Sequence, residues 1–513
     1  MRRLTDQQVD DIARRLAGRM AGTVGSAADG SAPAGRVGTA ARGYAPADVP
    51  ERGYVVRPIS PDPKAGPPPV RQGDGVFATV DDCVDAARAA FLNLAAGSLE
   101  RRQAIVAAIR ASMRRHGERL ARLAWEETGL GRFEHKILKN ALVTEKTPGT
   151  EALVPRAVSG DGGLTLTELA PFGVIGSITP TTNPTSTIIC NTIGMVAAGN
   201  AVVFNVHPGA AQCSMETVRE LNRAITGAGG PQNLVTAVAH PTIESAGELM
   251  HHKGINLLVV TGGPGVVKAA MKSGKRAICA GPGNPPVVVD ETADIAKAGR
   301  DIVTGAGFDN NIICVDEKEV FVVASVADRL IKAMRDAGAY LVDQAELRKL
   351  EKEIFQEIRG PRTHGVMNKD CVGKSAGALL ARIGVRPVGD PALIICDVPE
   401  DHPLVWSEQL MPVLPVVRVP DVDRAIALAR EAEHGFGHSA SMHSRNIEAL
   451  SRMARVMNTS IFVKNAPIVA GLGQGGEGHT SFTIASPTGE GLTDAVSFSR
   501  LRRCVLKDHF RIV

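Results

Sequence analysis

The chain contains 513 residues, of which 44% are hydrophobic and only 4% aromatic, and its formal net charge is +4. This length allows about three domain-sized units with substantial cores. The nearly balanced charge and the scarcity of aromatic side chains disfavour a nucleic-acid partner, and the absence of any run of about 18 apolar residues predicts no membrane span.

The first 20 residues predict an amphipathic helix, because apolar side chains recur along them at helical spacing. Those side chains are Val9, Ile12, Ala13, Leu16 and Met20. The following segment, 21–72, reads as a flexible linker, since 30 of the residues from 21 to 70 are Gly, Ala, Ser or Pro. Docking of the helix on the main body is one reading. The length of the linker favours the other, a tethered helix that binds a groove elsewhere.

The folded part of the chain begins near Gln72 and opens with two expected helices. The first spans 81–96. The second spans 99–128, with Ser98 as its N-cap and Gly129 at its end.

From residue 173 onward, strands alternate with helices, a pattern typical of a mostly parallel, doubly wound α/β sheet. Strands are expected at 173–178, 201–206, 234–238, 256–261 and 286–290, and helices at 185–198, 210–226, 243–251, 264–273 and 293–306. A second alternation predicts strands at 318–324, 392–396 and 413–418 and helices at 326–337, 344–358 and 422–432. Two such units predict a cleft between them, and sheets of this kind bind ligands beyond the carboxyl ends of their strands.

The eight cysteines are scattered, with neither a CxxC motif nor a Cys/His metal spacing among them. Reduced thiols in the cytoplasm and no metal site are therefore expected. Cys190, Cys279 and Cys396 lie in apolar runs and read as core residues. Cys314 follows the segment Phe308–Ile313 and can act as a nucleophile if the fold lowers its pKa from ~8.5 toward neutrality. Taken alone, a core cysteine is the more common reading.

Two glycine-rich strings and two polar residues are further candidates. Gly471–Gly476 has GxGxxG spacing, but no helix follows it, so a loop is expected there instead of a dinucleotide fingerprint. Thr261–Gly265 follows a strand and opens a helix whose N-terminus can attract phosphate, with a plain tight turn as the alternative. Asn183 is either a turn residue before Pro184 or a donor to a developing oxyanion. Glu408 alone reads equally as a solvated acid.

In combination, these residues resemble the aldehyde dehydrogenase superfamily over about residues 73–513. More narrowly, the chain is similar to the coenzyme-A-acylating acetaldehyde and propionaldehyde dehydrogenases of bacterial microcompartments. The motifs that carry this resemblance are Pro171–Gly176, Thr182–Thr185, Ala198–Asn200, His207–Ala210, Thr261–Gly265, Gly283–Pro286, Phe308–Cys314, Ser407–Pro412, Ser460–Asn465 and Gly475–Gly478.

The resemblance implies that Cys314 is the nucleophile and Asn183 the oxyanion donor, with NAD as hydride acceptor and coenzyme A as co-substrate. The cofactor-binding residues that it implies are Thr181, Asn205, His207, Pro208, Thr261, Gly262, Gly263 and Glu408. Among them, Glu408 matches the acid that holds the nicotinamide ribose. The lysine that the family usually places on the adenosine ribose is replaced here by Asn205, beside the His-Pro pair of the acylating branch.

Ala280 separates two reaction outcomes. Hydrolytic relatives carry a glutamate at this place, 34 residues before the cysteine, and it activates the water that cleaves the thioester. Because alanine accepts no proton, attack by water should be slow, whereas a thiolate needs less help. The sequence therefore predicts NAD-dependent oxidation of a short-chain aldehyde to its acyl-CoA. The alternatives are a hydrolytic aldehyde dehydrogenase and a catalytically idle shell-scaffold protein.

The resemblance also implies an aldehyde dehydrogenase-like organisation. The expected parts are an NAD/CoA-binding domain at 73–151 and 168–280, a catalytic domain at 281–480, and a small β oligomerisation element at 152–167 and 495–513 that predicts a homodimer or homotetramer. Enzymes of the acylating branch often carry a short N-terminal helix that directs them into a protein shell. Residues 1–20 are therefore expected to bind shell or cargo proteins, inside a bacterial microcompartment in the cytoplasm.

Overall fold

The computed structural model describes residues 72–513, which belong to the second of two units of the chain, Pro68–Val513. The helix expected at 1–20 and almost all of the linker expected at 21–72 lie outside the described residues. Within the described part, every helix is too short or too polar to cross a bilayer. No three or more His, Cys, Asp or Glu side chains of that part gather as a metal site would require.

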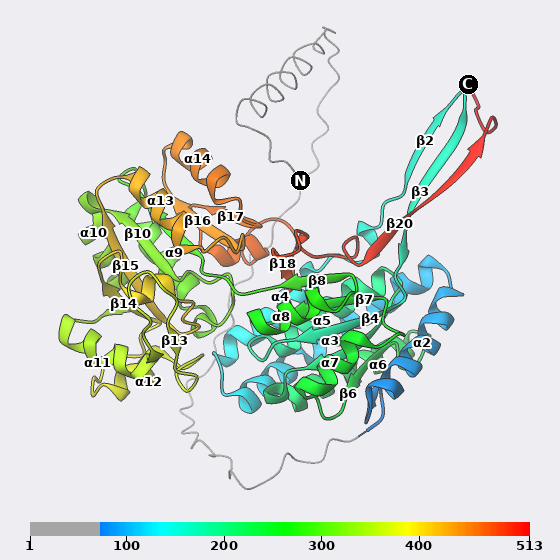
Figure 1. Ribbon diagram of the computed structural model, residues 1–513, viewed down its shortest axis with the longest axis horizontal. Helices are drawn as coiled ribbons and strands as arrows, with labels where there is room; N and C mark the ends of the chain where they lie inside the picture. The colour runs from blue at the N-terminus through cyan, green and yellow to red at the C-terminus, as the bar shows by residue number, and fades with distance from the viewer. Residues whose placement is uncertain (1–71) are drawn as a thin grey trace. The chain divides into compact units, whose positions relative to one another are not determined.

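The first half of the described chain is built on a six-stranded, wholly parallel sheet (Figure 1). In spatial order its strands are β1 (Val76–Phe77), β6 (Val235–Val238), β5 (Ala201–Val206), β4 (Val174–Thr179), β7 (Leu257–Thr261) and β8 (Ala277–Ala280). The strand order reverses at β4, whose neighbours are β5 and β7. The carboxyl ends of these central strands therefore open onto one crevice, where ligands of doubly wound sheets bind.

Helices cover both faces of this sheet. They are α2 (Val80–Ala95), α3 (Leu99–Thr128), α4 (Phe133–Lys146), α5 (Pro184–Ala197), α6 (Ala211–Gly227), α7 (Ile243–His251) and α8 (Pro264–Lys272). Helix α2 packs with α7, whereas α5 and α6 pack together beneath α3, and α4 contacts both α3 and α5. As expected, the Ser98 hydroxyl caps α3, and Gly129 ends that helix with a φ of 62°.

The second half contains a seven-stranded parallel sheet. In spatial order its strands are β11 (Ala339–Leu341), β14 (Leu393–Asp397), β15 (Val413–Val419), β10 (Glu319–Val323), β9 (Pro286–Val289), β16 (Ser439–His443) and β17 (Ile461–Lys464). Its helices are α9 (Ile295–Ala306), α10 (Ala324–Asp336), α11 (Gln344–Ile354), α12 (Ala376–Arg382), α13 (Val422–Ala432) and α14 (Ile447–Met457).

Alternation along β9 shows why this sheet needs helices on both faces. Val287 and Val289 join one apolar core, with residues of α9 and α10, while Val288 joins the other, with residues of α13 and α14. Successive side chains of a strand point to opposite faces, so a continuous valine run can be fully buried only in a sheet covered on both sides.

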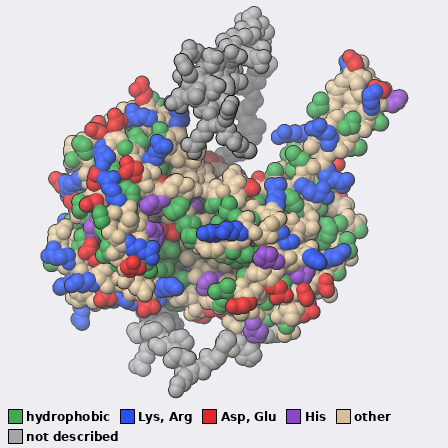
Figure 2. Space-filling view, in the orientation of Figure 1, with side chains coloured by type: hydrophobic (Ala, Val, Ile, Leu, Met, Phe, Trp, Pro, Cys, Tyr) green, Lys and Arg blue, Asp and Glu red, His purple; other side chains and the backbone are tan. Residues whose placement is uncertain are grey.

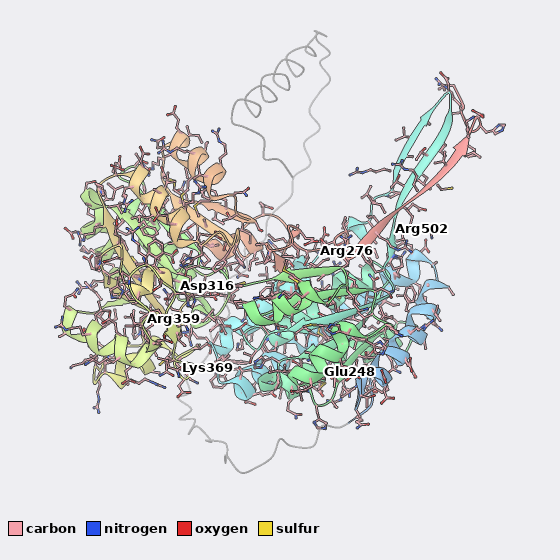
Figure 3. The ribbon with its side chains drawn as sticks, viewed as in Figure 1. Glu248, Arg276, Asp316, Arg359, Lys369 and Arg502 are labelled. Carbon is pink, nitrogen blue, oxygen red and sulfur yellow. The ribbon has the colours of Figure 1, made fainter. Side chains whose placement is uncertain are left out.

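A three-stranded antiparallel sheet extends away from the six-stranded sheet (Figure 1). It consists of β2 (Arg156–Gly160), β3 (Gly163–Pro171) and β20 (Ser499–Lys507), so it joins the two segments that the sequence assigned to an oligomerisation element. Strand β20, which carries Arg502, is an edge strand, and its residues after Ser499 are all exposed (Figure 3). Hydrophobic and basic side chains both cover this sheet (Figure 2).

Most of the expected elements are present within a few residues of their expected ends, but the helix expected over 344–358 is too long. Helix α11 ends at Ile354, and Phe355–Glu357 forms β12, which pairs with β13 (Val366–Met367). The side chain of Phe355 is buried, and the residue ends the helix in an extended conformation. No Gly or Pro marks this break in the sequence. Helix α4 was not expected at all.

The remaining short elements lie in the connections. They are the 3-10 helices η1 (Thr150–Ala152), η2 (Pro208–Ala210), η3 (Phe308–Asn311), η4 (Pro403–Trp406) and η5 (Ile468–Leu472), and the paired strands β18 (Ile484–Ala485) and β19 (Gly491–Leu492).

Candidate active site

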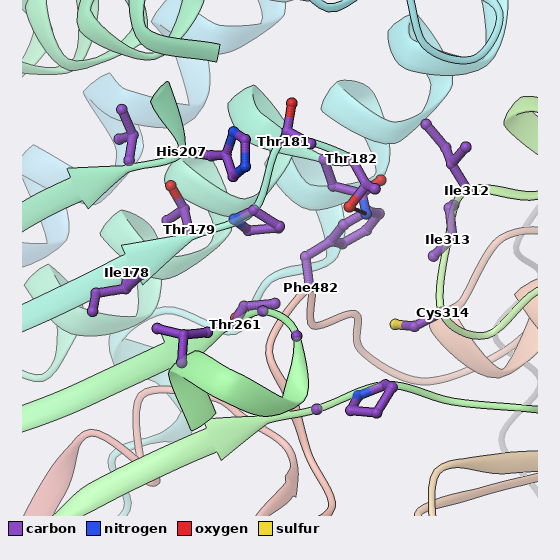
Figure 4. A pocket seen from close by; sticks show the side chains of 18 of the residues that line it. Ile178, Thr179, Thr181, Thr182, His207, Thr261, Ile312, Ile313, Cys314 and Phe482 are labelled. Carbon is purple, nitrogen blue, oxygen red and sulfur yellow. Dashed lines mark hydrogen bonds between the residues drawn. The ribbon is translucent and has the colours of Figure 1, made fainter. Parts of the chain in front are cut away.

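One cavity of about 530 Å³ lies at the carboxyl ends of β4, β5, β7 and β8 and is also lined by segments of the second half (Figure 4). The cleft expected between the two α/β halves is therefore present. All ten residues that the sequence proposed for the site line it: Thr181, Asn183, Asn205, His207, Pro208, Thr261, Gly262, Gly263, Cys314 and Glu408. The Cys314 thiol points away from its loop into the space beside Phe482 (Figure 4).

The loop that carries Cys314 has an unusual backbone. Asp309, Asn310 and Asn311 have φ values of 45°, 55° and 63°, a left-handed region that Asp and Asn tolerate better than most other residues. The side chain of Asn310 donates to the Gly373 carbonyl at 2.9 Å, and that of Asn311 donates to the Ala306 carbonyl at 2.8 Å. The polar side chains before the cysteine thus hold the loop in place through internal hydrogen bonds.

Four consecutive charged side chains, from Asp316 to Glu319, follow the loop that carries Cys314 and are completely buried. Burial raises the pKa of Asp316 and Glu319 far above the usual range and raises that of Glu317 to about 8. The Lys318 ammonium donates to the carbonyls of Asn311 and Ile313, at 3.0 and 3.2 Å. A charged run of this kind usually marks a solvated turn, but here it leads into β10, a central strand.

The environment of Cys314 does not lower its pKa, contrary to the condition that the sequence set. Although the side chain is partly exposed, burial raises the pKa of Cys314 to about 12, and the negative charge of Glu408 adds to the rise. Lys318 acts in the opposite direction. The thiol is therefore protonated at neutral pH, because desolvation outweighs the one favourable charge.

Asn183 precedes α5 and lines the cavity, while the carbonyl oxygen of its side chain faces the buried Lys139. Its Oδ1 accepts a hydrogen bond from the Lys139 ammonium at 2.6 Å, and its Nδ2 donates to the Thr182 hydroxyl at 3.1 Å. Lys139 belongs to α4 and also pairs with Asp309. The amide at the cavity is thus connected to the nucleophile loop through a buried lysine that the sequence analysis did not single out.

Glu408 is the only residue with a carboxyl group among the described residues that line the cavity. It accepts a hydrogen bond from the Gly283 backbone N–H at 3.3 Å. Burial raises its pKa, whereas Lys318 and the bond from Gly283 oppose the rise. Ala280 ends β8, is 3% exposed, and carries only a methyl group, so it offers no carboxyl group at the end of that strand.

The crevice side of the cavity suits a phosphate-bearing ligand. Gly263 is the N-cap of α8, Pro264 begins the helix, and an added Cβ at Gly263 would meet no atom within 4 Å. Backbone N–H groups at such a helix start attract anions, and a glycine lets a ligand approach closely. Thr261 is held beside them by a bond of 2.9 Å between its hydroxyl and that of Thr483.

Asn205, near the end of β5, and His207, just after that strand, differ in how accessible they are to a ligand. Asn205 is 3% exposed, and its Oδ1 accepts from the Ser245 hydroxyl at 2.6 Å, which ties it to the start of α7. His207 is exposed, and its Nδ1 accepts from the Gly209 N–H at 3.0 Å. The neutral imidazole therefore carries its proton on Nε2. Although the residue is exposed overall, partial desolvation of its imidazole lowers the pKa of His207, which favours this neutral form.

The chain belongs to the aldehyde dehydrogenase family, whose model matches residues 62–495. Its two parallel α/β halves and the Cys314 loop facing the start of α8 across one cavity are what the resemblance to that family implied. The acetylating acetaldehyde dehydrogenase of Salmonella typhimurium is 51% identical over 440 residues, which cover 86% of this chain and 94% of that protein.

Two solved relatives share the fold. The propionaldehyde dehydrogenase of Rhodopseudomonas palustris, solved with bound coenzyme A and an acylated cysteine, is 50% identical with a TM-score of 0.83, over 85% of this chain and 99% of that one. A propionaldehyde dehydrogenase from the fucose utilisation bacterial microcompartment of Clostridium phytofermentans is 48% identical with a TM-score of 0.83, over 86% and 100% of the two chains.

Proposed function

We propose that the protein oxidises a short-chain aldehyde to its acyl-CoA, with NAD⁺ as hydride acceptor and coenzyme A as acyl acceptor. The observation that carries this proposal is a cavity that joins Cys314 and Asn183, while Ala280, the buried end of β8 just before the lining residues Gly281 and Pro282, offers no carboxyl group. The names of the relatives support it, since one is an acetylating enzyme and another holds both coenzyme A and an acylated cysteine.

In this proposal Cys314 attacks the aldehyde carbon, and its thiol proton is released to water as the carbon–sulfur bond forms. The Asn183 amide and the Cys314 backbone N–H donate to the carbonyl oxygen as it becomes negative, which is where fixed donors lower the barrier most. NAD⁺, when bound, accepts the hydride that leaves the same carbon. The product on the protein is an acyl thioester of Cys314, and the coenzyme A thiol displaces Cys314 from it.

Binding of the dinucleotide is assigned to the crevice side of the cavity. Gly262 and Gly263, at the start of α8, would hold the pyrophosphate, and Glu408 would hold the nicotinamide ribose. Thr181, Thr261, Asn205, His207 and Pro208 complete the set of cofactor-binding residues. The domains that follow from this assignment are cofactor-binding at 73–151 and 168–280 and catalytic at 281–480.

Transfer to coenzyme A, and not to water, follows from Ala280. A water molecule needs a base to attack a thioester efficiently, and the methyl group of Ala280 supplies none. NADH production should therefore be sustained with coenzyme A and stop after a burst near one equivalent per active subunit without it. Sustained NADH production without coenzyme A would favour the hydrolytic alternative, and no NADH in either case would favour the idle scaffold.

The projecting sheet is proposed to join copies of this chain into a homodimer or homotetramer. Edge strand β20 exposes Leu501 by 74% and Val505 by 61%, together with unpaired backbone groups along nine residues. Val158 on β2 is also 70% exposed. Leu501→Glu should lower the mass of the native protein in light scattering, whereas an unchanged mass would show that the oligomer forms elsewhere.

The helix expected at 1–20 is proposed to direct the protein into the lumen of a bacterial microcompartment through shell or cargo proteins. The apolar spacing of those residues and a relative from a microcompartment support this. Changing Ile12 and Leu16 to Glu should abolish co-localisation of a fluorescent fusion with shells while aldehyde oxidation persists. Unchanged co-localisation would exclude this helix as the targeting element.

A further inference from the structure

We propose that Lys139 is the positioning residue of the oxyanion donor: its ammonium fixes the orientation of the Asn183 carboxamide and is itself fixed by Asp309 on the nucleophile loop. The proposal rests on the role proposed above for Asn183. It assigns to α4 a part in catalysis that neither the motifs nor the names of the relatives attribute to it.

The hydrogen-bonding chemistry sets which end of the amide faces the lysine. An ammonium has three donors and no acceptor, so only the carbonyl oxygen of Asn183 can face Lys139. The contact is a hydrogen bond of 2.6 Å between the Lys139 Nζ and the Asn183 Oδ1. The amide N–H₂ is thereby directed the other way, toward Thr182, which lines the same cavity as Cys314.

The start of α5 shows that this contact diverts Asn183 from its ordinary use. Asparagine at an N-cap usually accepts a hydrogen bond from the first turn of its helix. Asn183 is the N-cap of α5, yet its side chain makes no capping bond. The carbonyl oxygen that would otherwise cap the helix accepts a hydrogen bond from Lys139 instead. The capping bond is therefore replaced by a contact with a residue 44 positions earlier in the sequence.

Asp309 keeps the lysine in place. Lys139 is 2% exposed and Asp309 is completely buried, and their charged groups are in direct contact. The other carboxylate oxygen of Asp309 accepts from the Arg132 backbone N–H at 2.6 Å. A buried ammonium persists only with such a partner, because an unpaired charge in the interior is strongly unfavourable.

The residues around the start of α4 pack closely against Asp309 on the loop that carries Cys314. Gly131, just before the helix, has a φ of 75°, and a Cβ added there would lie 2.1 Å from a carboxylate oxygen of Asp309. On the helix itself, His135 Nδ1 accepts from the Asp309 backbone N–H at 2.7 Å, and its ring stacks on Phe308. One aspartate thus couples the oxyanion donor to the segment that ends in the nucleophile.

Lys136 provides a matched control in the same helix. It is also 2% exposed and also contacts Asp309, with 3.4 Å between its Nζ and the carboxylate, but within the described residues its ammonium forms no hydrogen bond with Asn183. A purely structural role of the buried charges would make the two lysines similar. A positioning role singles out Lys139.

The test compares Lys139→Met, Lys136→Met, Asn183→Ala and the double variant Lys139→Met/Asn183→Ala in the full-length enzyme. The kcat and KM are measured with propionaldehyde, NAD⁺ and coenzyme A, beside thermal melting. Lys139→Met should lower kcat roughly 10–100-fold with little change in KM, the scale expected when a catalytic group is misplaced. Lys136→Met should keep kcat within a few-fold of the original.

The double variant shows whether Lys139 acts through Asn183 or independently of it. If Lys139 acts through Asn183, its removal should cost no further kcat once Asn183 is alanine. An equal loss in both backgrounds, or an equal loss from Lys136→Met, would overturn the proposal. Should Lys139→Met melt below the assay temperature, Lys139→Gln takes its place with the same criterion. Loss of activity in Asn183→Ala itself tests the role of Asn183, so failure of the proposed function remains distinguishable.

Discussion

Replacing Asn183 with alanine removes the proposed oxyanion donor while leaving the nucleophile in place. One such donor is worth about 10²–10³ in kcat, or about 2.7–4 kcal/mol. Asn183 is only 7% exposed, so water has limited access to replace the lost N–H. The upper part of that range is therefore expected. Activity should not vanish, because the Cys314 backbone N–H remains.

The same change has a separate effect on stability. Lys139 loses its acceptor at 2.6 Å but keeps Asp309. The free energy of unfolding should therefore fall by about 1–3 kcal/mol, the range for one polar group left unsatisfied. Asn183→Asp separates the two effects, since its carboxylate still accepts from Lys139 but offers no N–H to the substrate.

The assay is NADH production with a short-chain aldehyde and saturating coenzyme A, beside thermal melting of each variant. Asn183→Asp should melt near the original protein and yet be at least as slow as Asn183→Ala. Wild-type kcat in Asn183→Ala would refute the donor role. High activity in Asn183→Asp would show that the carbonyl oxygen, and not the N–H₂ group, is the part that matters.

Further predictions concern the nucleophile and the acceptor. Cys314→Ala should abolish NADH production while Cys279→Ala and Cys396→Ala retain it, and turnover by Cys314→Ala would exclude that residue as the nucleophile. Because the pKa of Cys314 is raised to about 12, its alkylation by iodoacetamide, followed by peptide mass spectrometry, should accelerate roughly tenfold per pH unit from 7 to 9. A plateau near pH 7 would contradict the raised pKa. Ala280→Glu should increase acid release without coenzyme A, and no increase would show that a carboxylate there cannot reach the thioester.

The sequence was sufficient for the parts of the site that depend on motifs. The alternation of buried strands and helices predicted two parallel sheets, and Asn183, Cys314 and Glu408 all line the cavity that those sheets form. These residues stand in short local strings after strands or in loops. Asn183 follows β4, where the rule that ligands bind at the carboxyl ends of parallel strands places it, whereas Cys314 and Glu408 precede β10 and β15 and reach the cavity from the second half.

Helix α4 could not be recognised from its sequence pattern, because polar side chains occupy the face that is buried. Its buried residues are Lys136, Lys139, Asn140, Val143 and Thr144, so most of the inward face is polar. A search for apolar residues at helical spacing misses such a helix. Arg132, at its N-cap, makes no side-chain capping bond either. Only the tertiary partners, Asp309 and Asn183, explain why lysines occupy that face.

The protonation state of the Cys314 thiol could not be predicted from the sequence either. A thiol pKa depends on how far burial disfavours the thiolate and on which charges surround it. The charges near Cys314 come from Glu408, Asp316 and Lys318, and burial, the largest cause, is set by packing across the cavity. The sequence only set a lowered pKa as the condition for a nucleophile, and the polar side chains before the cysteine hold the loop through internal hydrogen bonds.

The identity of the acyl acceptor is the central claim, and the fate of the acyl group tests it most directly. The enzyme is incubated with propionaldehyde and NAD⁺ without coenzyme A, and the intact protein and its peptides are then weighed by mass spectrometry. A propionyl group should remain on Cys314 and should leave as propionyl-CoA when coenzyme A is added. An unmodified Cys314 with free propionate accumulating over many turnovers would contradict the account.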